Sequence, residues 1–336
     1  MSEVRDPASL PICVVLDCNE WIRLKWLGSA VGLTFISAMQ SDPTISMAIP
    51  EVLESELNKH RAETARALLD RLHNVIDEIN VVGGDITLGG VITTTEEEID
   101  VAIRERLSAI RKQVLYPEMD VGETRRALQR VNAETAPNGH KNQQMKDSLL
   151  WEACLSLSAV YRVFFVTGDT GFYTNRDIRK GLAANLAAET PVQEGRLRVF
   201  SSLEEAVPAF APKIAVDRGE LASVGGRDLI AARAQEAFRR SPVATDLHPA
   251  IALRGVVPQY LRTEVPHVFA VSFSAFFLIN NGIEDRPHGD AVVVGQCRLD
   301  AREASIDAVT LEVIHWTLSN PGGGMGKVRE VLDVAL

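Results

Sequence analysis

The chain lacks several features that define common classes of protein. Its four cysteines, Cys13, Cys18, Cys154 and Cys297, form no CxxC pair and have no histidine partner at zinc-binding spacing. This pattern predicts buried free thiols rather than disulfides or a zinc finger. No apolar run approaches the length of about 20 residues that a transmembrane helix needs. The polar N-terminus, residues 1–7, is unlike a secretory signal, so we expect a cytoplasmic protein with no membrane partner.

Positive charge is also in short supply. The chain has 35 lysines and arginines against 45 aspartates and glutamates, which gives a net charge of −10 at pH 7. This balance argues against a protein that coats nucleic acid through bulk electrostatics, but it leaves room for an enzyme that binds nucleic acid locally. The length of 336 residues favours two domains, and 46% hydrophobic residues are typical of a globular core.

The first two hundred residues alternate short strand-like and helix-like segments, which predicts a parallel α/β sheet. We expect strands at 12–16, 46–49, 80–82, 163–166 and 197–200. We expect helices at 19–30, 51–79, 94–115, 122–133, 147–160 and 179–188. The helix at 51–79 follows a proline and repeats apolar residues every three or four positions. The third helix opens on a capping box, Thr95 with Glu98.

The pattern changes after about Ala211. A helix is expected at 228–239, followed by long, partly alternating strands at 268–279, 291–299 and 309–318. A glycine-rich turn, 321–327, then precedes a short C-terminal helix. This turn does not match a phosphate-binding loop, because Pro321 takes the place of the first glycine and Val328 follows Lys327. The pattern predicts a second, α+β domain over residues 211–336.

Four carboxylates fall where strands give way to loops or on the first turns of helices: Asp17, Glu56, Asp147 and Asp169. If the strands are parallel neighbours, these side chains converge at one edge of the sheet. Crowded carboxylates repel one another unless a cation neutralises them. Hard oxygen ligands of this kind suit Mg²⁺ or Mn²⁺. Taken one at a time, such acids are also ordinary helix caps and turn formers.

The order of these residues resembles the PIN domain over roughly residues 10–210. The resemblance rests on Asp17, on Glu56-Leu57, on Lys146-Asp147 with Leu150-Trp151, and on Val166-Thr167-Gly168-Asp169 followed by Phe172. It implies a PIN-like three-layer α/β/α domain with a parallel sheet over residues 1–210. The stretch at about 83–142 is longer than a minimal PIN domain needs, and we interpret it as a helical insertion.

The resemblance also implies a function, which is metal-dependent hydrolysis of single-stranded RNA by an endoribonuclease. It assigns catalysis and the binding of Mg²⁺ or Mn²⁺ to Asp17, Glu56, Asp147 and Asp169. Thr167 matches a supporting hydroxyl residue, and Asn19 is a candidate for orienting substrate or a metal-bound water. Just before Asp147, the candidates for contact with RNA phosphates are His140, Lys141 and Lys146.

Two other functions stay open. An Asp-nucleophile phosphohydrolase would use Asp17, although such enzymes usually carry a second aspartate where this chain has Asn19. A catalytically silent PIN-like scaffold that binds RNA or protein is the other alternative. The strand-rich second domain leaves room for a homo-oligomer through exposed strand edges, and for an antitoxin or inhibitor protein as partner. The sequence does not distinguish a toxin from an RNA-processing enzyme.

Overall fold

The structure is a computed structural model that describes residues 9–82, 95–139, 143–212, 214, 216, 226–240, 250–280, 288–319 and 325–335. Its internal contacts divide the chain into two compact units. The first unit consists of Met1–Ile22 and Met39–Ala206, and the second of Arg23–Ala38 and Val207–Leu336. Each unit contains one five-stranded sheet.

The sheet of the first unit is entirely parallel and has the order β3-β2-β1-β4-β5. Its strands are β1 (Ile12–Leu16), β2 (Ile45–Ala48), β3 (Val114–Leu115), β4 (Arg162–Val166) and β5 (Leu197–Phe200). The central strands β1 and β4 pair over their whole length, and their residues 13–16 and 163–166 are completely buried. Burial on both faces is usual for parallel strands. The strand order reverses between β1 and β4, so right-handed crossovers place the connections of the two halves on opposite faces.

Helices connect these strands. They are α1 (Cys18–Arg23), α3 (Glu51–Val82), α4 (Glu96–Ala109), α5 (Val121–Asn132), α6 (Met145–Leu157), α7 (Ala184–Ala187) and α8 (Thr190–Gln193). The helices α2 (Ala30–Ser41) and α9 (Leu203–Phe210) each run from one unit into the other. Short 3₁₀ turns occupy Arg111–Gln113, Thr170–Phe172, Thr174–Arg176 and Ile178–Lys180.

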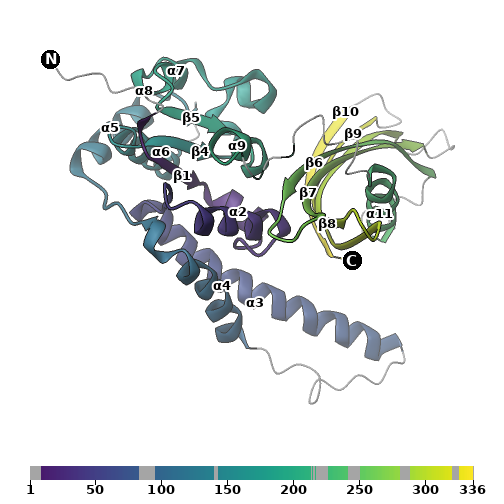
Figure 1. The fold of residues 1–336 in the computed structure, drawn as a ribbon. Helices are drawn as coiled ribbons and strands as arrows, with labels where there is room; N and C mark the ends of the chain where they lie inside the picture. The colour runs from purple at the N-terminus through teal and green to yellow at the C-terminus, as the bar shows by residue number, and fades with distance from the viewer. Residues whose placement is uncertain are drawn as a thin grey trace. The chain divides into compact units, whose positions relative to one another are not determined.

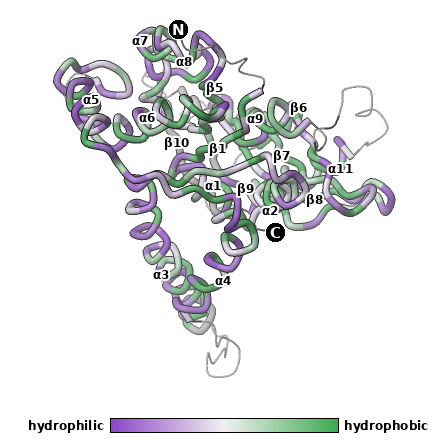
Figure 2. The backbone as a smooth tube through the Cα atoms, turned by 60° about the vertical axis from the view of Figure 1, so that its left-hand side comes forward, coloured by the Kyte–Doolittle hydropathy of each residue, from purple (hydrophilic) through white to green (hydrophobic). Residues whose placement is uncertain are grey.

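The helices α3 and α4 lie side by side (Figure 1). Two ion pairs join them, Arg61 with Asp100 and Arg66 Nε with Glu96 Oε1 at 3.5 Å. Although α3 is the longest helix, hydrophilic residues recur along it (Figure 2). No helix within the described ranges combines the length and the apolar character needed to cross a membrane.

A buried glutamate holds α6 against α5. Glu152 of α6 is completely buried, and its two carboxylate oxygens each accept a hydrogen bond of 2.6 Å, one from Arg126 Nε and one from Arg130 Nε. Arg130 also donates to Glu189 at 2.5 Å. Because α6 carries Asp147 in its first turn, this network helps to fix the position of a candidate site residue.

Most predicted elements of the first unit are confirmed. The strands at 12–16, 46–49, 163–166 and 197–200 correspond to β1, β2, β4 and β5 within one residue at each end. The long helix after Pro50, the helix at 122–133 and the helix at 147–160 correspond to α3, α5 and α6. The capping box is also present, since Thr95 accepts from the Glu98 N–H while Glu98 accepts from the Thr95 N–H.

Two predicted helices are wrong in part. The helix at 19–30 stops at Arg23, because the next turn has left-handed residues, including Trp26 and Leu27 with φ of 56° and 59°, whose side chains are buried. The helix predicted to reach Leu115 stops at Ala109. Gln113 Nε2 then donates to three backbone carbonyls, those of Met39, Asp42 and Ile45, and β3 follows as an edge strand paired with β2.

Three further predictions are wrong. Residues 80–82 continue α3 instead of forming a strand, and Val81 and Val82 are exposed rather than buried in a sheet. The helix at 179–188 is reduced to a 3₁₀ turn and the short α7, because Gly181 adopts a φ of 73° between them. The short C-terminal helix is instead a strand that pairs with its predecessor.

The second unit contains an antiparallel sheet of order β10-β9-β8-β7-β6 and the helix α11 (Arg227–Arg240). The strands are β6 (Ala250–Arg262), β7 (Val268–Asn280), β8 (His288–Asp300), β9 (Ser305–Ser319) and β10 (Met325–Ala335). The curved sheet wraps around α11 (Figure 1), and Phe238 stacks against Phe277 with ring centroids 4.6 Å apart. The sequence predicted α11 and three of these strands, but neither β6 nor β10.

A buried polar chain ties the segment Arg23–Ala38 to the sheet of the second unit. Arg23 pairs with Glu312 at 3.1 Å, and Glu312 also accepts from Gln296 Nε2 at 2.6 Å. The side-chain oxygen Oε1 of Gln296 in turn accepts from the Val31 N–H at 3.3 Å. A segment that follows β1 in sequence therefore packs in the unit formed mainly by the C-terminal residues.

We expect Glu152→Ala to destabilise the first unit by about 3 kcal/mol, because it leaves the guanidinium of Arg130 without its buried partner. Arg126→Ala is the matched control, with an expected cost of about 1 kcal/mol or less, since Arg126 is about half exposed with a side-chain accessibility of 49%. Urea unfolding followed by tryptophan fluorescence measures both. Equal losses in the two variants would contradict this account.

Candidate metal centre at the sheet edge

Asp17 and Thr167 lie at the carboxyl ends of the two central strands. The Asp17 N–H donates to the Val166 carbonyl at 2.9 Å, so the residue follows β1 while still joined to β4. The Thr167 hydroxyl donates to Asp17 Oδ2 at 2.8 Å. Asp17 is 6% exposed and Thr167 is completely buried. The hydroxyl therefore fixes the orientation of a buried carboxylate at the point where the strand order reverses.

The same hydroxyl positions Asp169. The Asp169 N–H donates to Thr167 Oγ1 at 3.0 Å, and Asp169 Oδ1 accepts from the Gly171 N–H at 2.7 Å. A Cβ atom added at Gly171 would lie 2.8 Å from Gln144 Oε1 and 3.0 Å from the Pro137 carbonyl oxygen, so a larger residue there would force these neighbours to move. The Tyr173 hydroxyl donates to the Thr167 carbonyl at 2.8 Å and closes the turn.

Two helices bring the other acids to this edge. Glu56 lies in the second turn of α3, which begins directly after β2, and Asp147 lies in the first turn of α6, which leads into β4. Because both helices have their N-termini at the carboxyl ends of the strands, the two acids face the same edge as Asp17 and Asp169. We call Asp17, Glu56, Asp147 and Asp169 the acidic cluster.

The pKa shifts show that the four charges act on one another. Burial raises the pKa of Asp17 to about 6, with the charges of Asp169 and Glu56 adding to the increase and the hydrogen bond from Thr167 opposing it. Burial raises the pKa of Asp147 to about 7, and the charges of the other three acids raise it further. Lys146 opposes that shift. Asp17 and Asp147 therefore hold protons at a pH where ordinary carboxylates have lost them.

This donor set fits a hard divalent cation. Carboxylate oxygens are the ligands that Mg²⁺ and Mn²⁺ prefer, and Mg²⁺ usually keeps several waters while using few protein ligands. Within the described part of the chain, no three acids of the cluster bring oxygens within 4.8 Å of one another. Water molecules can fill that spacing, and a cation would remove the mutual repulsion. The acidic cluster is thus suited to hydrated Mg²⁺ or Mn²⁺.

Aromatic packing anchors two of the acids. Trp151 of α6 contacts Phe165 of β4 and Phe172, with ring centroids 6.3 and 6.1 Å apart, and Phe165 and Phe172 are 5.2 Å apart. All three rings are completely buried. Trp151 lies one turn after Asp147, and Phe172 lies three residues after Asp169. The rings therefore fix the backbone segments that carry both carboxylates.

The other residues predicted for the site lie in different surroundings. Asn19 is exposed in the first turn of α1. Lys146 is exposed, with Nζ 3.5 Å from Glu56 Oε1, so it is close to the acidic cluster. His140 and Lys141 lie outside the described residues.

Sequence reasoning missed a second group of ligand-forming side chains. Cys18, Glu56 and His60 place a sulfur, a carboxylate oxygen and an imidazole nitrogen within 4.8 Å of one another. The four cysteines are free and buried, as predicted. The spacing of four residues between Glu56 and His60 on a predicted helix indicates a shared face. Nothing in the sequence places Cys18 beside them.

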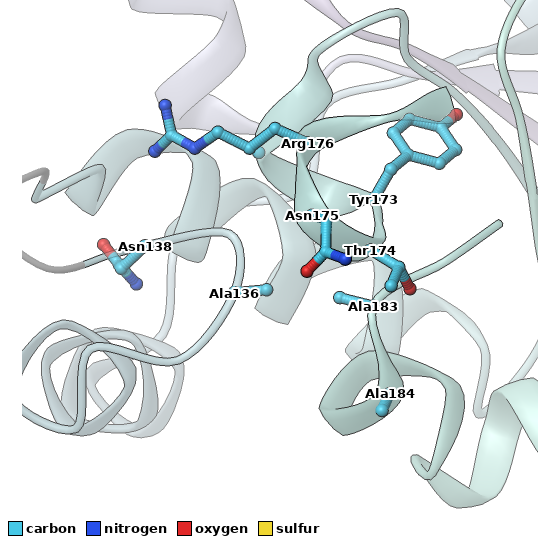
Figure 3. A pocket seen from close by; sticks show the side chains of 9 residues that line it. Ala136, Asn138, Tyr173, Thr174, Asn175, Arg176, Ala183 and Ala184 are labelled. Carbon is cyan, nitrogen blue, oxygen red and sulfur yellow. The ribbon is translucent and has the colours of Figure 1, made fainter. Parts of the chain in front are cut away.

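A pocket of about 300 Å³ lies next to the loop that carries Asp169. It is lined by Ala136, Asn138, Gly171, Tyr173, Thr174, Asn175, Arg176, Ala183 and Ala184. Figure 3 shows Arg176 extending to the side of the pocket where Asn138 lies, while the ring of Tyr173 points the other way. Since the backbone of Gly171 both lines the pocket and binds Asp169, the pocket adjoins the acidic cluster.

No protein-family model, curated protein or solved structure matches this chain. Its function is therefore inferred from the fold and from the geometry of the acidic cluster.

We expect the metal-free protein to lose stability as the pH rises from about 4 to 7. The folded-state pKa values of Asp17 and Asp147, about 6 and 7, exceed the ordinary value of 3.8. The folded state therefore binds more protons than the unfolded state in that interval, and the free energy of unfolding falls until both acids are ionised.

Asp147→Asn tests this expectation in EDTA. The variant should be more stable than the unchanged protein at pH 7.5, by roughly 1 kcal/mol, and equal to it at pH 4.5. Asp70→Asn, an exposed acid on α3, is the control and should show no such difference. Urea unfolding at the two pH values measures the effect, and a variant that is less stable at pH 7.5 would contradict it.

Proposed function

We propose that the chain is a PIN-like, metal-dependent endoribonuclease that hydrolyses single-stranded RNA. The observation that carries this proposal is the convergence of four carboxylates at the carboxyl edge of a parallel sheet, where burial and the charges of neighbouring acids raise the pKa of Asp17 and Asp147. Two of them, Asp17 and Asp169, follow the strands between which the strand order reverses. Open α/β sheets bind their ligands at this switch point.

The chemistry of phosphodiester hydrolysis matches the donor set. The reaction needs a water nucleophile and stabilisation of negative charge on the leaving oxygen, and Mg²⁺ or Mn²⁺ supplies both when bound. The cation would be held by the four acids of the cluster, Asp17, Glu56, Asp147 and Asp169. Thr167 keeps Asp17 and Asp169 in fixed positions through its two hydrogen bonds. Preorganised ligands of this kind reduce the reorganisation that the reaction requires.

Single-stranded RNA is the substrate that the surroundings favour. The net charge of −10 excludes binding by bulk electrostatics, so phosphates must be held by a few local cations. Arg176 lines the pocket beside the Asp169 loop together with the polar residues Asn138, Thr174 and Asn175. Lys146 lies beside Glu56 of the acidic cluster, with Nζ 3.5 Å from Glu56 Oε1. A flexible single strand can place one phosphate at the acidic cluster and a neighbouring nucleotide in the pocket.

We expect Mn²⁺- or Mg²⁺-dependent cleavage of labelled single-stranded RNA, which EDTA abolishes. Asp17→Asn, Asp147→Asn and Asp169→Asn should each lower the rate by about 100-fold or more, because each removes a negatively charged metal ligand. Asp70→Asn again serves as the matched exposed control and should retain full activity. Gel analysis of a 5′-labelled oligonucleotide measures the rates, and circular dichroism confirms that each variant is folded.

The products and competing substrates separate this proposal from the alternatives. Because water is the nucleophile, one 2′-deoxy nucleotide at the cleavage position should leave the rate within about threefold, and no cyclic phosphate should form. Release of phosphate from a generic phosphomonoester without RNA cleavage would indicate an Asp17-nucleophile phosphohydrolase instead. RNA binding that persists in EDTA, with no cleavage under any condition, would indicate a catalytically silent scaffold.

Arg176→Ala should raise the KM for RNA by about tenfold with little change in kcat, since one charge-assisted contact to a phosphate is worth about 1.5 kcal/mol. Arg179→Ala is the matched control, because Arg179 is an exposed arginine three residues away that pairs with Asp177 and does not line the pocket. Steady-state kinetics at two salt concentrations measure both variants. An equal rise in KM for the two would show that the pocket does not bind the substrate.

A further inference from the structure

The cysteine at the start of α1 faces a glutamate and a histidine that occupy consecutive turns of α3. Cys18 is 5% exposed and directly follows Asp17, while Glu56 and His60 are both partly buried. The three potential ligand atoms all lie within 4.8 Å of one another. We call these three residues the thiol site. It shares Glu56 with the acidic cluster, but its other two members have different ligand chemistry.

A fourth residue prepares His60 to bind a metal. His60 Nδ1 lies 3.0 Å from Glu63 Oε2, so this carboxylate is within reach of an N–H on Nδ1. In the tautomer that carries its proton on Nδ1, the lone pair is on Nε2, which lies 3.9 Å from Glu56 Oε1. Histidines that bind metals usually donate their other N–H to a carboxylate, which fixes the tautomer and raises the basicity of the ligand. Glu63 has that position here.

The ligand types select a different cation from the one suited to the acidic cluster. Thiolate and imidazole favour borderline ions such as Zn²⁺, whereas carboxylates alone suit Mg²⁺ and Mn²⁺. Cys18 lies beside Glu56 and directly follows Asp17, so the thiol site already has negatively charged neighbours. A divalent cation would compensate these charges, and the thiol would release its proton to solvent on binding.

We propose that Cys18, Glu56 and His60 form a zinc site with three protein ligands and an open fourth position. Such sites commonly take a water as the fourth ligand. Zn²⁺ at the thiol site withdraws Glu56 from the acidic cluster. It also displaces Lys146 from its contact with Glu56. Zinc thereby inhibits the reaction supported by Mg²⁺ or Mn²⁺. The binding of zinc stands by itself, whereas the inhibition rests on the proposed nuclease function.

Cobalt substitution tests the site without any assay of activity. The metal-free protein is titrated with Co²⁺, and a thiolate ligand should give charge-transfer absorption in the near ultraviolet that saturates at one equivalent. Zn²⁺ should then displace the band. Cys18→Ser should abolish the band, and His60→Ala and Glu63→Gln should weaken the affinity by about tenfold or more. His73→Ala, an exposed histidine further along α3, should leave the titration unchanged.

Two results would overturn the zinc site: no charge-transfer band in the folded protein, or a titration that His60→Ala leaves unchanged. Because His60 is partly exposed, the His60→Ala variant keeps the test decisive if Cys18→Ser fails to fold.

In the RNA cleavage assay with Mn²⁺, one equivalent of Zn²⁺ should reduce the rate of the unchanged protein, whereas the His60→Ala variant should need about tenfold more Zn²⁺ for the same reduction. Equal inhibition of both would refute the shared role of Glu56. A cobalt band in a protein that cleaves no RNA would support the zinc site and reject the nuclease.

Discussion

The burial of like-charged carboxylates close together at the carboxyl edge of the parallel sheet is the constraint on which the first unit depends. Four acids from separate parts of the sequence meet there, and the raised pKa values of Asp17 and Asp147 show that the protein resists ionising all of them. Burying charge without compensation costs free energy. The packing around the site must therefore offset this cost until a cation is bound, and a cation is the ligand that removes it most directly.

Hydrogen bonds, aromatic packing and ion pairs around the acids offset this cost in free energy. Thr167 hydrogen-bonds with both Asp17 and the backbone of Asp169, so a single hydroxyl links two acids across adjacent strands. Trp151 and its neighbouring rings fix the helix that carries Asp147, and the pairing of Glu152 with two arginines fixes the same helix on its other side. Rigid supports of this kind keep ligands in place when no metal is bound.

Local sequence patterns predicted the elements that form by local rules and failed where distant contacts decide. The long helix after Pro50 and the Thr95 capping box follow from apolar spacing and capping chemistry. By contrast, β3 is only two residues long and exists because β2 lies beside it, with Gln113 binding three carbonyls just before it. The C-terminal strand likewise depends on pairing with β9, which no short window of sequence reveals.

The candidate site shows the same division. The acids could be predicted because each follows a strand or opens a helix, and parallel strands end at one edge. Cys18 also follows a strand, yet its neighbours His60 and Glu63 come from a helix that begins more than thirty residues later. Their proximity depends on how α3 packs beside α1, which only the folded chain determines. As a result, Glu56 lies between hard oxygen ligands and a soft sulfur ligand. In the proposed function and the proposed zinc site, the identity of the cation would decide which set of ligands Glu56 completes.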